Sequence, residues 1–137
     1  MQRKMIIVII TILMLLLSGC GKTDYELTRI GDNTTIKVNN TTDGKTADTD
    51  YFTVGKNEHV AIECSLDKGS LTMEFIEVTV FINLDGGPDD IIENKSVKTI
   101  TVTGNDATTV ELERGDYIIR ITTVGNTGGT VKVNVEK

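Results

Sequence analysis

Apolar and polar residues alternate with a period of two along most of the chain after Leu17, and no stretch there sustains a helical period. The alternating segments are rich in Thr, Val and Ile, which favour strands. Short groups of Gly, Asn and Asp separate these segments. We therefore expect an all-β fold, an antiparallel β-sandwich of jelly-roll or immunoglobulin-like type, with a barrel as the alternative.

The pattern divides the chain into eight or nine short strands. The expected strands cover residues 25–30, 34–39, 51–54, 58–66, 71–83, 97–103, 108–113, 116–124 and 130–136. Turns are expected at 67–70, 104–106 and 125–129, where glycine is present. In the longest strand the inward apolar face shifts by one position between Phe75 and Val78, which is typical of a β-bulge.

Two longer polar segments, residues 40–50 and 84–96, are expected to be surface loops. The second contains Ile91 and Ile92, which we expect to pack back onto the core because large apolar side chains are usually buried. Long loops on a rigid scaffold commonly carry binding function, so these two are the expected binding loops.

The first 20 residues have the order of a bacterial export signal. Arg3 and Lys4 precede an uncharged stretch, residues 5–17, that has the length of a secretory core and is shorter than the roughly 20 apolar residues of a membrane-spanning helix. The stretch ends in Leu17-Ser18-Gly19-Cys20, which resembles the lipobox of bacterial lipoproteins. In that family a signal peptidase cuts before the cysteine, whose sulfur carries a diacylglycerol.

This resemblance implies three parts: a cleaved signal peptide (residues 1–19), a lipidated tether (20–24) and a β-sandwich domain (25–137). Two acyl chains give stable anchoring, so the lipid on Cys20 implies a protein held on the extracytoplasmic face of the cell membrane. An ordinary cleaved signal or a cytosolic hydrophobic tail is the alternative.

The mature domain is acidic. Cleavage would remove Arg3 and Lys4, so 12 of the 14 basic residues remain against all 20 acidic ones, a net charge of about −8. This argues against a nucleic-acid partner, which requires a basic face, and against the domain itself lying on anionic lipid. The acidity mainly supports solubility.

Few residues suit catalysis. Once Cys20 carries lipid, Cys64 is the only thiol, and its place on the apolar face of a strand predicts a buried structural side chain. His59 is the only histidine and is expected on the opposite, exposed face, so a zinc site of two or three histidines is excluded within one chain. No nucleophile elbow supports a triad, and an enzyme is not expected.

The segment Asp85-Gly86-Gly87-Pro88-Asp89-Asp90 is the most suggestive of a ligand. Calcium takes six to eight oxygen ligands, and aspartates in a glycine-rich loop can supply several. Asp85, Asp89 and Asp90 are therefore candidate calcium ligands, and Asp48 and Asp50 would add to them if the fold joins the two loops. The alternative is a solvated turn in which Asp and Gly serve the backbone.

The tripeptide Arg114-Gly115-Asp116 spells an integrin-binding motif. It is expected at a tight hairpin between two strands, where glycine permits the positive φ of the turn. A turn explains all three residues without adhesion.

Two further segments carry a family resemblance. Asp48-Thr49-Asp50-Tyr51-Phe52-Thr53-Val54 and the apolar-x-x-Gly-x-Tyr pattern that begins at Leu112 resemble pre-peptidase C-terminal-type β-sandwich domains, although the tryptophan common near their start is missing. The ending is also similar to that of small lipoproteins of Gram-positive bacteria. The resemblance implies a non-catalytic accessory module on the cell surface and transfers no site residue.

Two functions fit these features. The first is a binding or accessory module that engages a surface protein or a wall polymer, and the second is a structural or inhibitory lipoprotein that acts on a membrane neighbour. The first predicts a contiguous apolar patch on the folded surface, whereas the second is compatible with a polar surface throughout.

Overall fold

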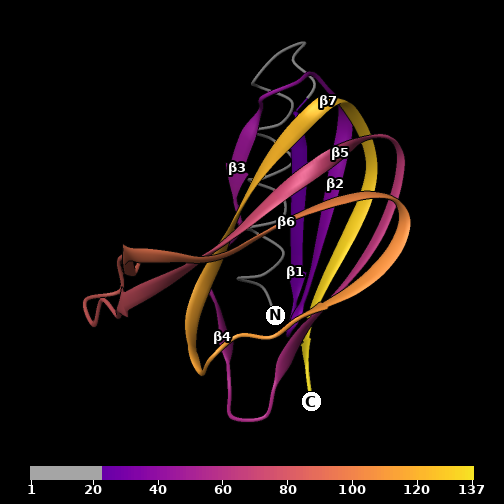
Figure 1. The fold of residues 1–137 in the computed structure, drawn as a ribbon. Helices are drawn as coiled ribbons and strands as arrows, with labels where there is room; N and C mark the ends of the chain where they lie inside the picture. The colour runs from indigo at the N-terminus through magenta and orange to yellow at the C-terminus, as the bar shows by residue number, and fades with distance from the viewer. Residues whose placement is uncertain (1–22) are drawn as a thin grey trace.

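The sheet of this protein folds back on itself. A computed structural model describes residues 23–137, so Cys20 and the expected signal segment lie outside the described residues. The predicted all-β antiparallel sandwich is confirmed, because seven strands, all paired antiparallel, form one sheet (Figure 1). The strands are β1 (Tyr25–Ile30), β2 (Asn33–Thr41), β3 (Thr46–Asp48), β4 (Phe52–Val54), β5 (His59–Phe81), β6 (Asp90–Val110) and β7 (Gly115–Glu136).

Three long strands, β5, β6 and β7, take part in both halves of the folded sheet. In the first half the strand order is β1, β2, residues 127–136 of β7, residues 59–66 of β5 and residues 105–110 of β6, and each segment pairs with the next. The second half holds β3 and β4 with residues 115–124, 70–81 and 90–103. Most of the nine expected strands are therefore segments of longer ones.

The three long strands bend side by side at what we call the corner, residues 67–69, 104–105 and 125–129. Glycines with positive φ stand at each bend: Gly69, Gly104, Gly125 and Gly129. The prediction of chain-reversing turns at these three places was wrong. The glycines do relieve backbone strain, but each strand continues past the corner, and β5 stays paired with β6 and β7 on both sides of it.

One apolar core fills the space between the two halves. It is built from alternate residues of β2, β5 and β7 with contributions from β4 and β6. Cys64 is buried in this core, as predicted, and burial raises the pKa of its thiol. The largest side chains that are almost fully buried include Tyr117, Phe75, Ile62, Met73 and Ile121.

The predicted β-bulge near Phe75 is confirmed in position but not in detail. The register between β5 and β6 shifts twice there, and the unpaired residues, Asn94 and Val97, belong to β6. Alternation along β5 continues, so Ile76 faces away from the core that holds Phe75. Ile76, Val78 and Ile118 form a second buried cluster on the outer face, with Tyr51 and Val80 packed against it.

The β5–β6 hairpin projects beyond the sandwich as an arm, which we define as residues 79–93 (left in Figure 1). The expected loop 84–96 is shorter than predicted, because β6 already begins at Asp90. Ile91 and Ile92 do not pack onto the core but are 39% and 52% exposed. The other expected loop, 40–50, contains β3.

Candidate functional site

The candidate calcium ligands lie at the tip of the arm. Asp89 accepts a hydrogen bond from the backbone N–H of Asn83 (3.1 Å), and the hydroxyl of Tyr51 lies 3.5 Å from its other oxygen. Asp85 and Asp90 are exposed. Residues 23–137 contain no group of three or more His, Cys, Asp or Glu placed to hold a metal ion. Asp89 therefore stabilises the loop by accepting a backbone hydrogen bond, which is what the turn interpretation requires.

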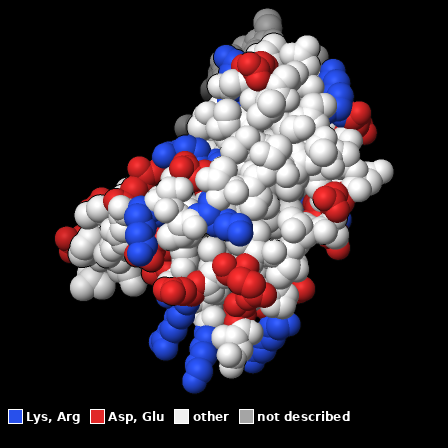
Figure 2. Space-filling model, in the orientation of Figure 1, with Lys and Arg blue, Asp and Glu red and all other residues white. Residues whose placement is uncertain are grey.

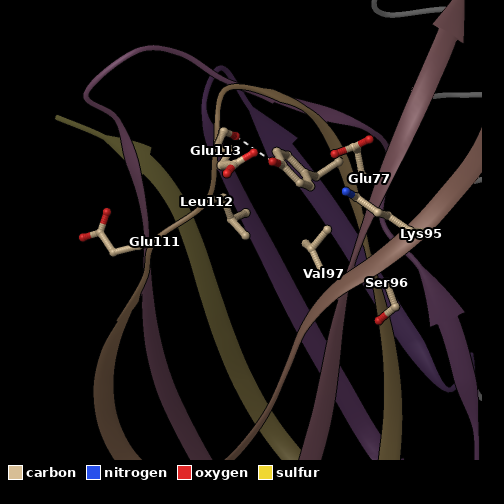
Figure 3. Close-up of a pocket in the computed structure, with 8 residues that line it drawn as sticks. Glu77, Lys95, Ser96, Val97, Glu111, Leu112 and Glu113 are labelled. Atoms are coloured by element: carbon tan, nitrogen blue, oxygen red, sulfur yellow. Dashed lines mark hydrogen bonds between the residues drawn. The ribbon is translucent and has the colours of Figure 1, made fainter.

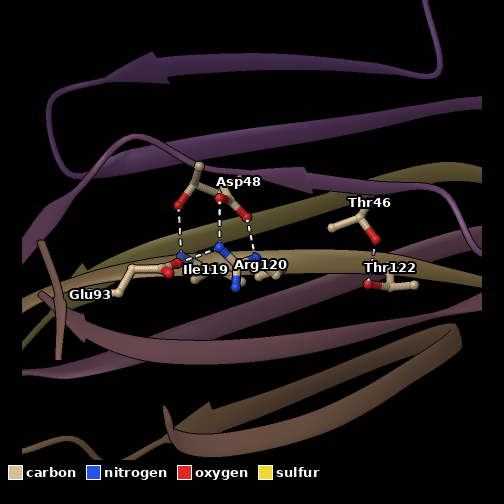
Figure 4. Close-up of polar contacts among 7 residues, drawn as sticks. Thr46, Asp48, Glu93, Ile119, Arg120 and Thr122 are labelled. Carbon is tan, nitrogen blue, oxygen red and sulfur yellow. Dashed lines mark hydrogen bonds and ion pairs between the residues drawn. The ribbon is translucent and has the colours of Figure 1, made fainter. Parts of the chain in front are cut away.

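The fold does bring the segment of Asp48 and Asp50 towards the arm, but it gives both carboxylates other partners. Asp48 receives two hydrogen bonds from the guanidinium of Arg120, from Nε at 2.9 Å and from Nη2 at 3.0 Å (Figure 4). Asp50 accepts from the backbone N–H of Tyr51. Glu93 of the arm bonds to Arg120 as well.

Arg120 thus joins β3, β7 and the arm on the outer face of the second half. Hydrogen bonds from the guanidinium to Asp48 and Glu93 raise the pKa of Arg120, although partial burial opposes the rise. No local pattern in the sequence indicates this network, because the partners stand 72 and 27 residues away from Arg120. The contact fixes the base of the arm to the body.

Replacing Arg120 by Ala is expected to loosen the arm while the sandwich stays folded. About a third of the Arg120 side chain is exposed, so we expect a loss of only about 0.5–1 kcal/mol in the free energy of unfolding. Hydrogen exchange of the amides of residues 90–95 should accelerate. The control is Lys37→Ala, which removes a surface ion pair with Glu26 and should leave the arm unchanged.

The Arg120 network should not make stability depend on pH in the neutral range. Because folding raises the pKa of this arginine, its ion pairs stabilise the fold at every pH below the pKa of the unfolded state. This contribution to stability is lost only as the pH rises through the pKa of the folded state. Both pKa values lie far above the neutral range. A stability difference between wild type and Arg120→Ala that grew between pH 7 and 10 would contradict this assignment.

An open cavity of about 360 Å³ lies where the arm leaves the body (Figure 3). Its polar groups include Glu77 and Lys95, which are cross-strand neighbours, and the carboxylates of Glu111 and Glu113. Tyr117 closes its inner wall; burial raises the pKa of this phenol, and the nearby carboxylates of Glu77 and Glu113 add to the effect. The lining includes neither His59 nor Cys64, so it offers no nucleophile activated by a histidine.

The Arg114-Gly115-Asp116 segment is not a tight hairpin, contrary to the prediction. β6 and β7 are not paired with each other, and residues 111–114 pass from one half of the sandwich to the other. Gly115 begins β7 opposite Val54, and Asp116 accepts a hydrogen bond from the hydroxyl of Thr53 (2.6 Å). The tripeptide thus consists of the residue before β7 and the first two residues of this paired strand.

The pattern from Leu112 to Tyr117 has a structural explanation. The hydroxyl of Tyr117 donates to the carbonyl of Glu113 at 2.6 Å, the type of bond found in the tyrosine corner of other sandwiches.

His59 is half-buried rather than exposed, because it pairs with Glu136 at the end of β7, with Nε2 3.4 Å from that carboxylate.

The arm carries most of the exposed large apolar side chains of the described chain. Of nine such residues in the region 23–137, five lie between residues 81 and 92: Phe81, Ile82, Leu84, Ile91 and Ile92. Leu84, at the tip, is 94% exposed. Figure 2 shows uncharged atoms bordered by acidic groups at the free end of the arm. We predicted a binding loop in this region, but we expected two of its isoleucines to lie in the core.

Comparison with known proteins gives no further guide. The chain matches no protein-family model, and none of the curated proteins matches it. Within residues 23–137, no helix has the length and apolar character needed to cross a membrane. The function is therefore inferred from the sequence and the geometry alone.

Proposed function

We propose that this protein is a lipoprotein anchored on the extracytoplasmic face of the membrane, and that its β-sandwich is a non-catalytic binding module. The observation that carries the binding role is the exposed apolar surface of the arm. Contiguous apolar surface rimmed by polar residues marks interaction sites, because a soluble monomer otherwise buries such surface. The arm extends beyond the sandwich, so its own chain leaves this surface uncovered.

The position of the first described residues supports the anchoring role. The carbonyl of Asp24 accepts hydrogen bonds from the backbone of Asn39 and the hydroxyl of Thr41, at the end of β2 beside the corner. The four residue steps from Cys20 to Asp24 span at most about 14 Å. A lipid on Cys20 would therefore hold the corner end of the sandwich close to the membrane.

The arm would point away from that anchored end. Phe81 lies twelve residue steps along β5 from Gly69 at the corner, a run of about 40 Å at roughly 3.3 Å per residue. The module would then present its apolar tip to partners beside or above the membrane, with the corner at the lipid surface.

Replacing Cys20 by Ala is expected to move the protein from the membrane fraction to the soluble fraction. Without the thiol no diacylglycerol can be attached, and the remaining chain has no acyl group to hold it. Cys64→Ala is the matched control and should stay in the membrane, with the mass of its mature chain still increased by the lipid. Retention in the membrane of a Cys20→Ala chain from which residues 1–19 have been removed would refute the anchor.

A further inference from the structure

We infer that the arm inserts into an apolar pocket of a partner protein, and that Lys or Arg residues border this pocket. The inference deepens the proposed function, because it takes the arm as the binding surface and assigns the chemistry of what it binds.

The apolar side chains of the arm lie on both of its faces. Phe81 pairs with Asp90, and Thr79 pairs with Ile92, so Phe81 and Ile92 are diagonal neighbours on one face. On the other face Ile91 is 39% exposed, while its cross-strand partner Val80 packs against the cluster of Ile76, Val78 and Ile118. One flat contact would cover only one of these faces, whereas a pocket that receives the arm covers both.

The charges around the tip have a single sign. Residues 81–93 contain four acidic residues and no basic one. Asp90 stands directly opposite Phe81, and Asp85 is exposed one position after Leu84 in the loop. An apolar centre with a charged border is the usual anatomy of a protein interface. Complementary charge on the partner then sets orientation and speeds association.

This charge pattern disfavours two other binding partners for the arm, a membrane surface and a second copy of this chain. The anionic surface of a membrane attracts basic segments, and the acidic tip would be repelled from it. Two copies docked tip to tip would bring Asp85, Asp90 and their equivalents together, and like charges across an interface are unfavourable. A partner with basic residues around its pocket has neither cost.

The base of the arm is held in place before binding. Ile76, Val78 and Ile118 are buried beneath it, and Glu93 is bonded to Arg120. Asp89 closes the tip through its bond to the backbone of Asn83. An arm that is already ordered loses less conformational entropy on docking, so its few exposed side chains suffice as anchors.

The test is photocrosslinking on cells that carry the full-length, anchored protein. A photoreactive amino acid replaces Leu84 at the tip, and in the control it replaces Ile30, which is 75% exposed at the end of β1. We expect one dominant crosslinked protein from position 84 and not from position 30. The partner peptide joined to position 84, mapped by mass spectrometry, should lie beside Lys or Arg residues.

Two variants in the background of the position-84 probe test the chemistry. Phe81→Ser with Ile92→Ser should reduce the crosslink at least tenfold, because removal of central apolar anchors commonly costs about 2 kcal/mol or more. Asp85→Asn with Asp90→Asn should also reduce it several-fold, and raised salt should do the same in the wild type. Asp89 is left intact because it closes the loop.

The outcomes separate the inference from the proposed function. A crosslink that needs the apolar side chains but ignores the aspartates and salt would overturn the basic pocket and leave the binding module standing. A crosslink to lipid or to a second copy would also overturn the inference. If position 84 captured no more than position 30, both the inference and the binding role of the arm would fail, while the anchor would still be judged by Cys20→Ala.

Discussion

Replacing Gly129 by Ala is expected to reduce the free energy of unfolding by about 4 kcal/mol, from a backbone strain and a steric overlap of about 2 kcal/mol each. Gly129 has a φ of +134°, which L side chains rarely adopt. A Cβ there would lie 2.4 Å from the carbonyl oxygen of Ser65 and 2.6 Å from the Cα of Leu66. Both atoms are backbone of β5 beside the corner, so relief would require the two longest strands to separate.

Gly104→Ala is the matched control. Gly104 stands at the bend of β6 with a φ of +60°, but a Cβ added there would meet nothing within 4 Å. It should therefore cost only the left-handed backbone conformation, about 1 kcal/mol. Urea denaturation followed by circular dichroism measures both. Equal losses for the two variants would mean that the close contact of β7 with β5 is not what requires glycine at position 129.

The corner also shows why the strands were predictable and their connections were not. Period-two alternation is a local property, so the segments 58–66 and 71–83 were identified from their own residues, and so was the buried Cys64. A glycine with positive φ serves a reversing turn and a shared bend equally well. Whether a reversing turn or a shared bend forms depends on whether the neighbouring strands bend at the same level. The residues of one short segment do not determine this.

The candidate site was predictable only in part, for the same physical reason. The sequence placed a binding loop between residues 84 and 96, and the exposed apolar tip lies largely there. The predicted burial of Ile91 and Ile92 was wrong, because it relied on the general rule that isoleucine is usually buried in a core. The two ion pairs of Arg120 join strands far apart in the chain, and no local pattern indicates them.

Replacing Phe75 by Ala is expected to cost about 3–5 kcal/mol, the usual range for a phenylalanine removed from a packed core. Phe75 is fully buried between the two halves of the sandwich. Domains are commonly stable by only about 5–15 kcal/mol, so this loss should lower the denaturation midpoint markedly and could leave little folded protein at growth temperature. Urea denaturation of the purified mature domain measures the effect.

Phe81→Ala is the matched control, since it is the same substitution six residues further along β5. Phe81 is 53% exposed, so its removal should change the free energy of unfolding by no more than about 0.5 kcal/mol. It should nevertheless weaken the crosslink from position 84, because its ring is one of the proposed docking anchors. One strand would then carry a phenylalanine that holds the fold and another that serves binding. A loss of stability for Phe81→Ala equal to that of Phe75→Ala would show instead that the arm packs against its own domain, and the docking surface would no longer be free.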